Sequence, residues 1–544
     1  MPVVTPTILR DGQAMDSSYS LVSIDIRKEV NRIPQAELRL IDGSTAQRKF
    51  AISDSGFFDP GAKIEIQLRY EGQPDTTVFK GIVVRHRVEA GTSGSTLVIG
   101  MKDAAVKLTG ARQSAVFADM SDSDIIKQLI ADAGLEAGEV ADTKPKHQKM
   151  VQYYATSWDF ILSRADAQGL LIVADDGMMS LAAIELAGEA KHKFDYGITE
   201  ILDFEIEVDA GSQYEEVASV AWDPKEQKLT DPTNASGTAV APGDLDGAQL
   251  RTDAGQGKAQ LSHQVPLTPD ELQAWADGRL ARSRLALCRG RIAVPGFAAI
   301  KPLDVMELIG VSKHFNGKTL VTGFSHRVDL QGWRTDVQFG LAAAPFGTSD
   351  DIVDAPAAGL LPAVSGLQLG IVASLEQDPD NELRVQVILP AVDPDKKTIW
   401  ARLASPDAGK DRGYVFRPEP EDEVVVGFFN NDPRHPVILG SLYGSKNTPA
   451  EDLAPSDKND RRGIVTKKGT TIGFVDGDKA SVFIQTANKN KLLLDDDAEE
   501  VSLEDQHGNK LTMNKDGIVL KSAKDFKIDA SGNVEIKGSK VDVK

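Results

Sequence analysis

Cysteine is almost missing from this 544-residue sequence, in which Cys288 is the only one. A single thiol cannot form an intrachain disulfide, so no such bridge is expected to hold the fold together. Cys288 stands in the largely apolar stretch 285–294, where a small buried hydrophobe is expected. The eight histidines include no pair at ligand spacing and have no cysteine partner, so the sequence predicts no metal site and no cofactor.

Basic residues are scarce relative to acidic ones, with 61 Lys and Arg against 81 Asp and Glu and a net charge of −20. A surface of this sign repels phosphate, which argues against nucleic acid as a partner. No apolar run is long enough to cross a membrane, and residues 1–13 lack the basic and apolar segments of a Sec-type signal. The chain is therefore expected to be made in a reducing cytoplasm without a signal peptide.

Aromatic residues are also few, at 6% of the chain, and nothing resembles an aromatic platform flanked by Lys or Arg. Closely spaced carboxylates occur at 495–497 and 499–500, but adjacent strand residues point to opposite faces. A solvated corner is expected there, in place of the facing carboxylate pair of a glycosidase. No catalytic residue is predicted, and the chain is interpreted as a protein without enzymatic activity.

What the sequence does contain is a C-terminal ladder of apolar pairs, in which the members of a pair are two residues apart. This is the period of a strand with one buried face. The pairs recur at a short, nearly fixed spacing, which is typical of a stacked β-solenoid. After a first pair at Leu492 and Leu494, the ladder consists of Val501, Leu503, Leu511, Met513, Ile518, Leu520, Phe526, Ile528, Val534, Ile536, Val541 and Val543.

Two small side chains per rung make no core within one chain. Several copies wound around one axis would place the rung residues in a common interior, so the residues from Val501 to Val543 are predicted to form the core of an intertwined needle. A meander of hairpins is the alternative, because Asp516-Gly517 is a good two-residue turn. The continued alternation favours the needle, and both structures remain open from the residues alone.

The first 341 residues predict a mainly β hub with one insertion. An inserted small α/β unit is expected over 120–199, with helices that begin at Ser121, in a capping-box pattern, and at Ser157. Residues 200–341 return to strands around a helix at 268–287 and predict a second hub β-barrel. A first hub β-barrel over 1–119 is predicted from alternating segments at 19–26, 36–41, 63–70, 78–89 and 95–101.

The second barrel repeats features of the first. The motif FKG at 79–81 leads to HRVE at 86–89, and FNG at 315–317 leads to HRVD at 326–329. An internal duplication of one barrel is the interpretation. Two similar barrels per chain would let three chains present six similar faces.

The remaining chain predicts four further parts. A linker rich in Ala, Pro, Gly and Asp covers 342–366. Five or six short strands over 367–444 predict a small closed barrel of the oligonucleotide/oligosaccharide-binding (OB) type, here called the collar. A polar neck is expected over 445–490 and the β-helix needle over 491–544.

Several short motifs in the hub and the collar resemble those of a known family. The hub contains FFDPG (57–61), VFKGIV (78–83), FNGK (315–318) and GWRTD (332–336). The collar contains WAR (400–402), PEPEDEV (418–424), DPRHP (432–436) and GSLY (440–443). In this order, and together with the tail, they resemble the VgrG spikes of type VI secretion and the hub-and-spike proteins of contractile phage tails.

The resemblance implies a homotrimer whose hub meets inner tube and baseplate proteins, with a PAAR-type tip protein on the needle end. It also implies transient contact with a target membrane when the sheath contracts. The chain is most similar to the spike of extracellular contractile injection systems, which implies synthesis in a bacterial cytoplasm and release in a phage-tail-like particle. The alternative is a trimeric tail-fibre-like glycan binder or cell-wall hydrolase, for which no dedicated domain is visible.

Overall fold

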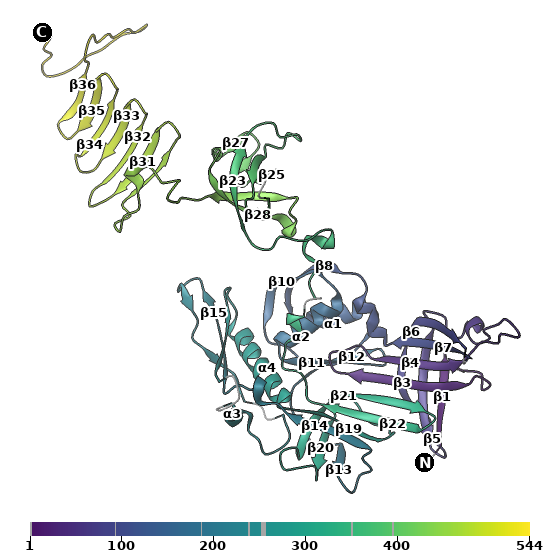
Figure 1. The fold of residues 1–544 in the computed structure, drawn as a ribbon. Coiled ribbons are helices and arrows are strands. Elements are labelled where there is room, and N and C mark those ends of the chain that lie inside the picture. Colours follow the sequence, from purple (N-terminus) through teal and green to yellow (C-terminus); the bar gives the residue numbers. More distant parts are fainter. Residues whose placement is uncertain are drawn as a thin grey trace. The chain divides into compact units, whose positions relative to one another are not determined.

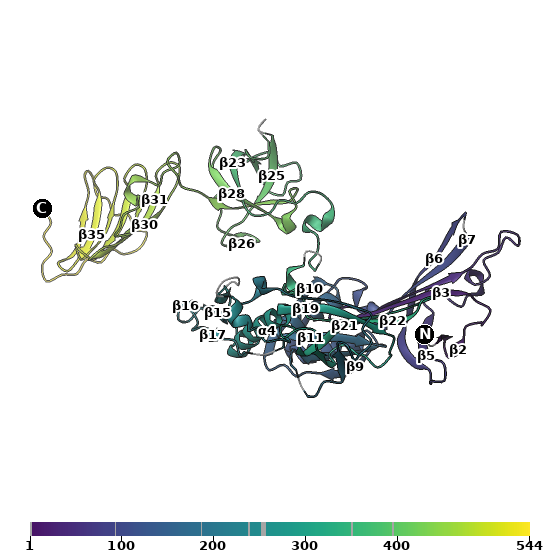
Figure 2. The same cartoon turned by 60° about the horizontal axis from the view of Figure 1, so that its bottom comes forward.

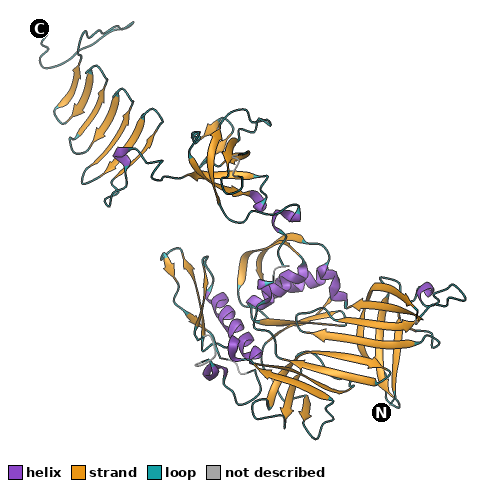
Figure 3. Cartoon of the chain, in the orientation of Figure 1, coloured by secondary structure: helices purple, strands orange, loops and turns teal. Residues whose placement is uncertain are grey.

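The computed structural model describes residues 3–92, 94–186, 188–237, 240–251, 257–349, 352–393 and 397–544. The described part is mainly β, as strands outnumber helices throughout Figure 3. The chain divides into two compact units, Met1–Asp354 and Ala355–Lys544. Among the described residues, no helix is long and apolar enough to span a membrane.

The first unit is built on one large sheet (Figure 1). Its described strands run in the order β14-β19-β22-β21-β3-β4-β7-β6-β5-β1-β2, with β20 attached to β21 and β13 to β20. Their bounds are β1 Val4–Arg10, β2 Gln13–Ala14, β3 Leu21–Glu29, β4 Gln35–Ile41, β5 Lys63–Tyr70, β6 Thr76–Gly91, β7 Gly94–Lys102, β13 His192–Asp195, β14 Asp203–Val208, β19 Cys288–Pro295, β20 Val305–Ile309, β21 Gly317–Asp329 and β22 Gly332–Phe339.

Residues 1–119 and 200–341, predicted as two barrels, are joined within this sheet. The junction is the antiparallel pairing of β3 with β21, from Ile24 opposite Val328 to Glu29 opposite Gly323. Each half keeps its own apolar core. Phe58, Phe79 and Leu97 belong to the first core, and Ile292, Val337 and Phe339 belong to the second.

The inserted α/β unit contains the two predicted helices, α1 Asp122–Asp132 and α2 Ser157–Ala167. Ser121 caps α1 in a capping box with Asp124, as the sequence predicts. A ribbon of β8 (Gln113–Ser121) and β10 (Lys146–Ala155) and a sheet of β11 (Leu170–Asp175), β12 (Met178–Ala183) and β9 (Glu136–Val140) complete the unit.

The long helix α4, Pro269–Leu287, begins after Thr268, which forms a second capping box with Glu271. It packs on β15 and crosses the end of α2, where a Cβ on Gly278 would lie 2.6 Å from the Cα of Gly169. The smaller elements beside it are β15 Val217–Asp223, β16 Lys228–Leu229, β17 Thr233–Asn234, α3 Gly247–Leu250 and β18 Ala259–His263.

The second unit begins with the predicted collar, in which five described strands close into a barrel in the order β23-β24-β25-β29-β28. Val385, Val387, Val424 and Val426 are fully buried at its centre. The strands of the collar are β23 Gln368–Ser374, β24 Val385–Ile388, β25 Thr398–Leu403, β26 Ala408–Gly409, β27 Arg412–Gly413, β28 Glu423–Phe428 and β29 Pro436–Ser441.

A seven-stranded antiparallel sheet, here called the tail sheet, follows the collar, and its strands lie side by side in Figures 1 and 2. It starts at Arg461, so three of its strands lie in the segment 445–490 that was expected to be a neck. Residues 522–544 are all described and contain no strand. The strands are β30 Arg461–Val465, β31 Thr471–Asp476, β32 Ala480–Gln485, β33 Lys491–Asp495, β34 Glu500–Glu504, β35 Lys510–Asn514 and β36 Gly517–Lys521.

Candidate assembly surface

One face of the tail sheet carries two columns of apolar side chains. Residues directly opposite each other on neighbouring antiparallel strands share a face, so the register of the pairing fixes the columns. The first column runs through Ile464, Ile472, Ile484, Leu492, Leu503, Leu511 and Leu520, and the second through Phe474, Val482, Leu494, Val501, Met513 and Ile518. This surface is called the two-column face below.

The two-column face is open to solvent in a single chain. Leu503, Ile518 and Leu520 are 54%, 70% and 63% exposed. Contiguous apolar surface of this extent on a soluble protein marks a site of association. Within one chain the strands pair as a meander of hairpins, and the apolar face of that meander is left exposed.

Six of the predicted needle-core residues lie in these columns: Val501, Leu503, Leu511, Met513, Ile518 and Leu520. The other six follow the last strand and are exposed without belonging to any strand: Phe526, Ile528, Val534, Ile536, Val541 and Val543. A single chain thus brings half of the set together. The role of all twelve as a needle core stays a prediction.

The sequence reasoning missed five column residues, Ile464, Ile472, Phe474, Val482 and Ile484, which all lie in the predicted neck. The last four show the same spacing of two residues as the pairs that follow. The signal was present at Ile472 and Phe474, with a glycine between them.

The opposite face of the tail sheet differs in packing. The ring of Phe483 covers Gly473, where a Cβ would lie 2.3 Å from the ring, so a glycine is required for this contact. The ammonium of Lys491 lies 5.3 Å from the centre of the same ring. Further along this face Ser502 is buried. The two faces are therefore not equivalent, because the two-column face carries continuous apolar columns and the opposite face is partly covered by its own side chains.

Asparagine side chains connect the corners on one edge of the tail sheet. The Oδ1 atom of Asn490 accepts a hydrogen bond from the backbone N–H of Gln506 at 3.1 Å. One corner further, the Oδ1 atom of Asn509 accepts from the N–H of Ala523 at 2.8 Å. Each asparagine thus ties its corner to the next corner on that edge, and the second bond holds the chain where it leaves β36.

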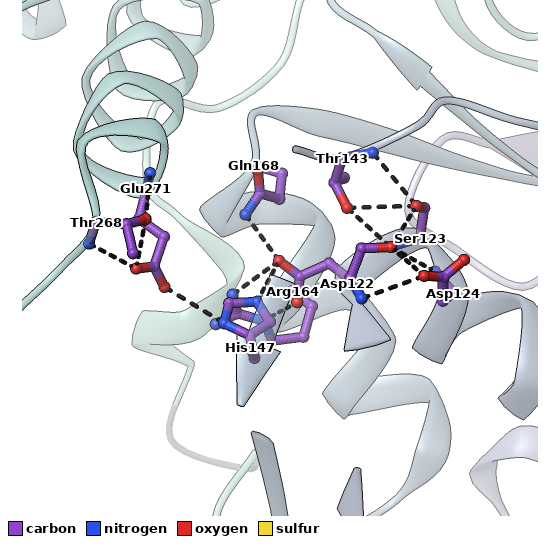
Figure 4. Close-up of polar contacts among 10 residues, drawn as sticks. Asp122, Ser123, Asp124, Thr143, His147, Arg164, Gln168, Thr268 and Glu271 are labelled. Atoms are coloured by element: carbon purple, nitrogen blue, oxygen red, sulfur yellow. Dashed lines mark hydrogen bonds and ion pairs between the residues drawn. The ribbon is translucent and has the colours of Figure 1, made fainter. Parts of the chain in front are cut away.

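The first unit contains a buried polar cluster that had to be tested as a chemical site (Figure 4). The carboxylate of Asp122, fully buried, accepts bonds from Arg164 Nε at 2.6 Å and Nη2 at 2.9 Å, and from Gln168 Nε2 at 2.7 Å. His147 Nε2 lies 3.2 Å from Asp122, and His147 Nδ1 lies 3.5 Å from Glu271 of α4.

Burial alone would raise the pKa of Asp122, but the Arg164 guanidinium and His147 outweigh it and hold that pKa below its ordinary value. An ionised carboxylate whose oxygens are occupied by a guanidinium, an imidazole and an amide is a poor acid, base or nucleophile. The cluster joins α1, α2, α4 and β10, and we interpret it as a structural clasp. Within the described ranges, no group of three or more His, Cys, Asp or Glu side chains is placed to hold a metal ion.

A concavity of about 1940 Å³ opens on the large sheet of the first unit. Several of its charged side chains form ion pairs. Arg291 lies 2.9 Å from Asp336, Arg334 lies 2.8 Å from Asp203, and Arg85 lies 2.7 Å from Glu37. These pairs neutralise the face locally, in contrast to the net charge of −20 of the whole chain.

Comparison with known families and proteins assigns these parts. Residues 1–329 match the Alg8 N-terminal domain, and residues 368–443 match the type VI secretion system/phage-baseplate injector OB domain. Residues 481–544 match the phage baseplate V C-terminal trimerisation domain. Over 490 residues the chain is 24% identical to the type VI secretion system spike protein VgrG1c of Pseudomonas aeruginosa. The chain belongs to the family of VgrG-like spikes with an Alg8 N-terminal domain.

That relative is matched over 84% of this chain and 64% of its own length. The spike protein VgrG1a of the same organism is also 24% identical, over 68% of this chain and 60% of the relative. The chain thus spans less than two thirds of the length of these relatives. The actin cross-linking toxin VgrG1 of Vibrio cholerae is 36% identical, but over only 11% of this chain and 5% of that protein.

Solved structures give more distant matches. A tail protein from Neisseria meningitidis aligns with 63% of this chain and 98% of its own, with 16% identity and a TM-score of 0.47. A component of the type VI secretion system of E. coli, described as similar to T4 tail proteins, aligns with 80% of this chain and 99% of its own. Its identity is 11% and its TM-score is 0.39.

Proposed function

We propose that this VgrG-like spike acts as a homotrimer that caps the inner tube of a contractile injection machine and pierces a target envelope when the sheath contracts. The two-column face carries the proposal. It is a long apolar surface left open by one chain, and it lies largely within residues 481–544, which match a trimerisation domain. Three copies would enclose these columns as a shared core, which gives a rod without independent parts to unfold.

The partners follow from this role. We propose that the hub meets inner tube and baseplate proteins, and that a PAAR-type tip protein covers the needle end, where apolar rungs and strand edges would otherwise face water. Contact with the target membrane would be transient and mechanical. No role is proposed for nucleic acid, because the excess of acidic residues opposes phosphate binding.

We further propose that the protein has no enzymatic activity of its own and needs no cofactor. The relatives matched over most of this chain are named as spike proteins. Synthesis in a bacterial cytoplasm, followed by assembly into a phage-tail-like particle released from the cell, is the proposed route. These proposals rest on the fold and on the family, and each can fail independently of the trimer.

A matched pair of substitutions in β36 tests the trimer. Leu520 lies on the two-column face at 63% exposure, and Val519 lies on the opposite face of the same strand at 59% exposure. Leu520→Asp would place three carboxylates at the shared axis. Burying each of them in its ionised form would cost about 3 kcal/mol. We expect sedimentation equilibrium to show a trimer for the unaltered chain and for Val519→Asp, and dissociation or a lower melting temperature for Leu520→Asp.

Two outcomes of these experiments would contradict the proposal. A full-length chain that sediments as a stable monomer would contradict it. An equal effect of Val519→Asp and Leu520→Asp would show that the two-column face is not the buried one.

A further inference from the structure

The ribbon of β8 and β10 leaves one of its two faces uncovered. In the described part of the chain it pairs with no third strand, and Figure 1 shows it beside α1 and α2 of the inserted unit. Its inner face is buried, with Phe117 in the core of that unit. On the outer face Val151 stands opposite Val116, and Tyr153 follows two positions along β10. These three side chains, here called the ribbon face, are 52%, 64% and 81% exposed in that order.

The backbone of β10 bulges at the end that carries the tyrosines. The register with β8 shifts between Gln152 and Ala155, and Tyr154 has a φ of 39°, which bulky residues rarely adopt. Local bonds hold this conformation: the N–H of Tyr154 donates to Ser114 Oγ at 3.0 Å, and Arg112 donates to the carbonyl of Tyr154 at 3.3 Å. A strained bulge of this kind is typical of places where side chains are positioned for binding.

The charge around the ribbon face is opposite to that of the whole chain. Residues 143–158 contain three lysines and no Asp or Glu, although the chain has a net charge of −20. Lys144, Lys146 and Lys149 are all exposed, and Lys149 lies on the outer face two positions before Val151. Lys144 and Lys149 form no ion pair with a described residue. A basic segment without counter-charges of its own attracts an acidic ligand.

We propose that the ribbon is the docking site of an extended segment of another protein, which pairs with the free edge of β10 as a third strand. A strand edge offers backbone N–H and C=O groups at a fixed spacing, and the addition of a strand is a general mode of peptide recognition. The start of β10 is basic and its end is apolar. The segment that fits is therefore acidic where it passes Lys146 and Lys149, and apolar where it passes Val151 and Tyr153.

The ribbon fits a protein segment better than a phosphate surface. A lipid headgroup or a nucleic acid could bind the lysines, but neither of them can pair with a strand edge. The docking site also goes beyond the proposed function. All of its residues belong to the first unit, so the inference does not rest on the proposed trimer.

Fluorescence anisotropy of the full-length protein with a labelled peptide tests the site. The probe is a peptide whose Val and Tyr residues precede its Glu residues, which is the order required for antiparallel pairing with β10. We expect Lys149→Glu and Val151→Ser each to weaken its binding about tenfold. Lys63→Glu and Val88→Ser are the matched controls, because both residues are exposed on other strands of the first unit. The controls are expected to leave the binding unchanged.

The backbone of the probe separates strand pairing from simple charge attraction. A peptide with the same side chains but methylated backbone nitrogens cannot pair as a strand, and it is expected not to bind. Equal binding of the methylated peptide, or no binding of the unmethylated one in the millimolar range, overturns the proposal. Binding of phosphatidylserine vesicles or duplex DNA that depends on Lys149 and excludes the peptide also overturns it, since the lysines would then serve a phosphate surface.

Hydrogen exchange locates the contact within the full-length protein. The peptide is expected to slow exchange at residues 148–153, and circular dichroism confirms that each variant is folded. Protection confined to other elements overturns the proposal. Protection of β10 without peptide that rises with protein concentration also overturns it, because a second copy of the chain would then cover the ribbon.

Discussion

At the scale of single residues, His326 shows how burial sets a charge state. It is 1% exposed, accepts a hydrogen bond at Nδ1 from Trp333 Nε1 at 3.3 Å, and lies 2.9 Å from Thr335 Oγ1. Burial first, and then the nearby Lys28 ammonium, lowers the pKa of His326 from 6.5 to about 3. The imidazole is therefore neutral in the folded protein at all ordinary pH values.

This state predicts a loss of stability in weak acid. Above pH 6.5 His326 binds no proton in either the folded or the unfolded protein. Its burial as a neutral imidazole therefore does not reduce the free energy of unfolding there. As the pH falls from 6.5 toward about 3, only the unfolded chain takes up the proton, which costs up to ~1.4 kcal/mol per pH unit. We expect the melting temperature to fall more between pH 7 and 5 in the unaltered protein than in His326→Gln. Parallel curves would contradict the assignment.

Lys28 gives a second prediction at this scale. Its ammonium is almost fully buried and contacts Asp175 and, at 3.0 Å, Asp176, whose carboxylate also accepts the backbone N–H of Lys80 at 2.8 Å. Burial would lower the pKa of Lys28, but the two carboxylates outweigh it and raise that pKa above its ordinary value. This ion cluster fastens the β11–β12 turn of the inserted unit to the large sheet.

Lys28→Met is expected to destabilise the first unit by about 3 kcal/mol, because two carboxylates would remain without their cation. Lys80→Met is the control, since the Lys80 ammonium is half exposed and pairs with Glu65 at 3.6 Å. Urea unfolding followed by tryptophan fluorescence measures both. Equal midpoints for the two variants would show that the cluster is not needed for docking.

At the scale of elements, the tail sheet depends on its corners as well as its strands. Asn509 accepts the N–H of Ala523, and it donates from Nδ2 to Asp505 Oδ2 at 2.7 Å. The bond from Asn509 Nδ2, followed by the Asn509 backbone N–H, lowers the pKa of Asp505, because both stabilise its charged form. The bond from Ala523 holds the chain where it leaves β36, and the described residues after it form no strand.

We expect Asn509→Ala to loosen β36 and the residues after it by about 1 kcal/mol, the usual value of a side-chain hydrogen bond. Hydrogen exchange of residues 517–523 should become faster by severalfold. Asn514→Ala is the control, because the side chain of Asn514 bonds within its own turn, to the N–H of Asp516 at 3.0 Å. Unchanged exchange in Asn509→Ala would show that the corner bond does not hold the strand.

Element positions set by local patterns were predicted well. The helix at Ser121 begins where its capping-box pattern predicts, and the helix expected over 268–287 begins after Thr268, because such terminal signals act within four residues. Alternation located strands such as β5 and β7 for the same reason. The strands β31 and β32 were missed because glycine, threonine and aspartate around their apolar pairs resemble a polar neck.

At the scale of the whole molecule, the tail sheet of the second unit leaves the two-column face exposed. In the proposed trimer this face would become the shared core. The prediction for Leu520 tests that burial.

The sequence alone determined the class of strands and helices, the apolar pairs of the tail and the excess of negative charge, since each depends on neighbours in the chain. It could not decide that β3 and β21 pair, because residues about 300 positions apart meet only when the large sheet folds. Nor could it decide which of two alternating tail faces stays open, since that depends on the registers of successive hairpins. Only the tertiary structure determined this pairing and this exposed face. Both depend on backbone hydrogen bonds between strands, and the residues of a strand do not specify which strand it pairs with.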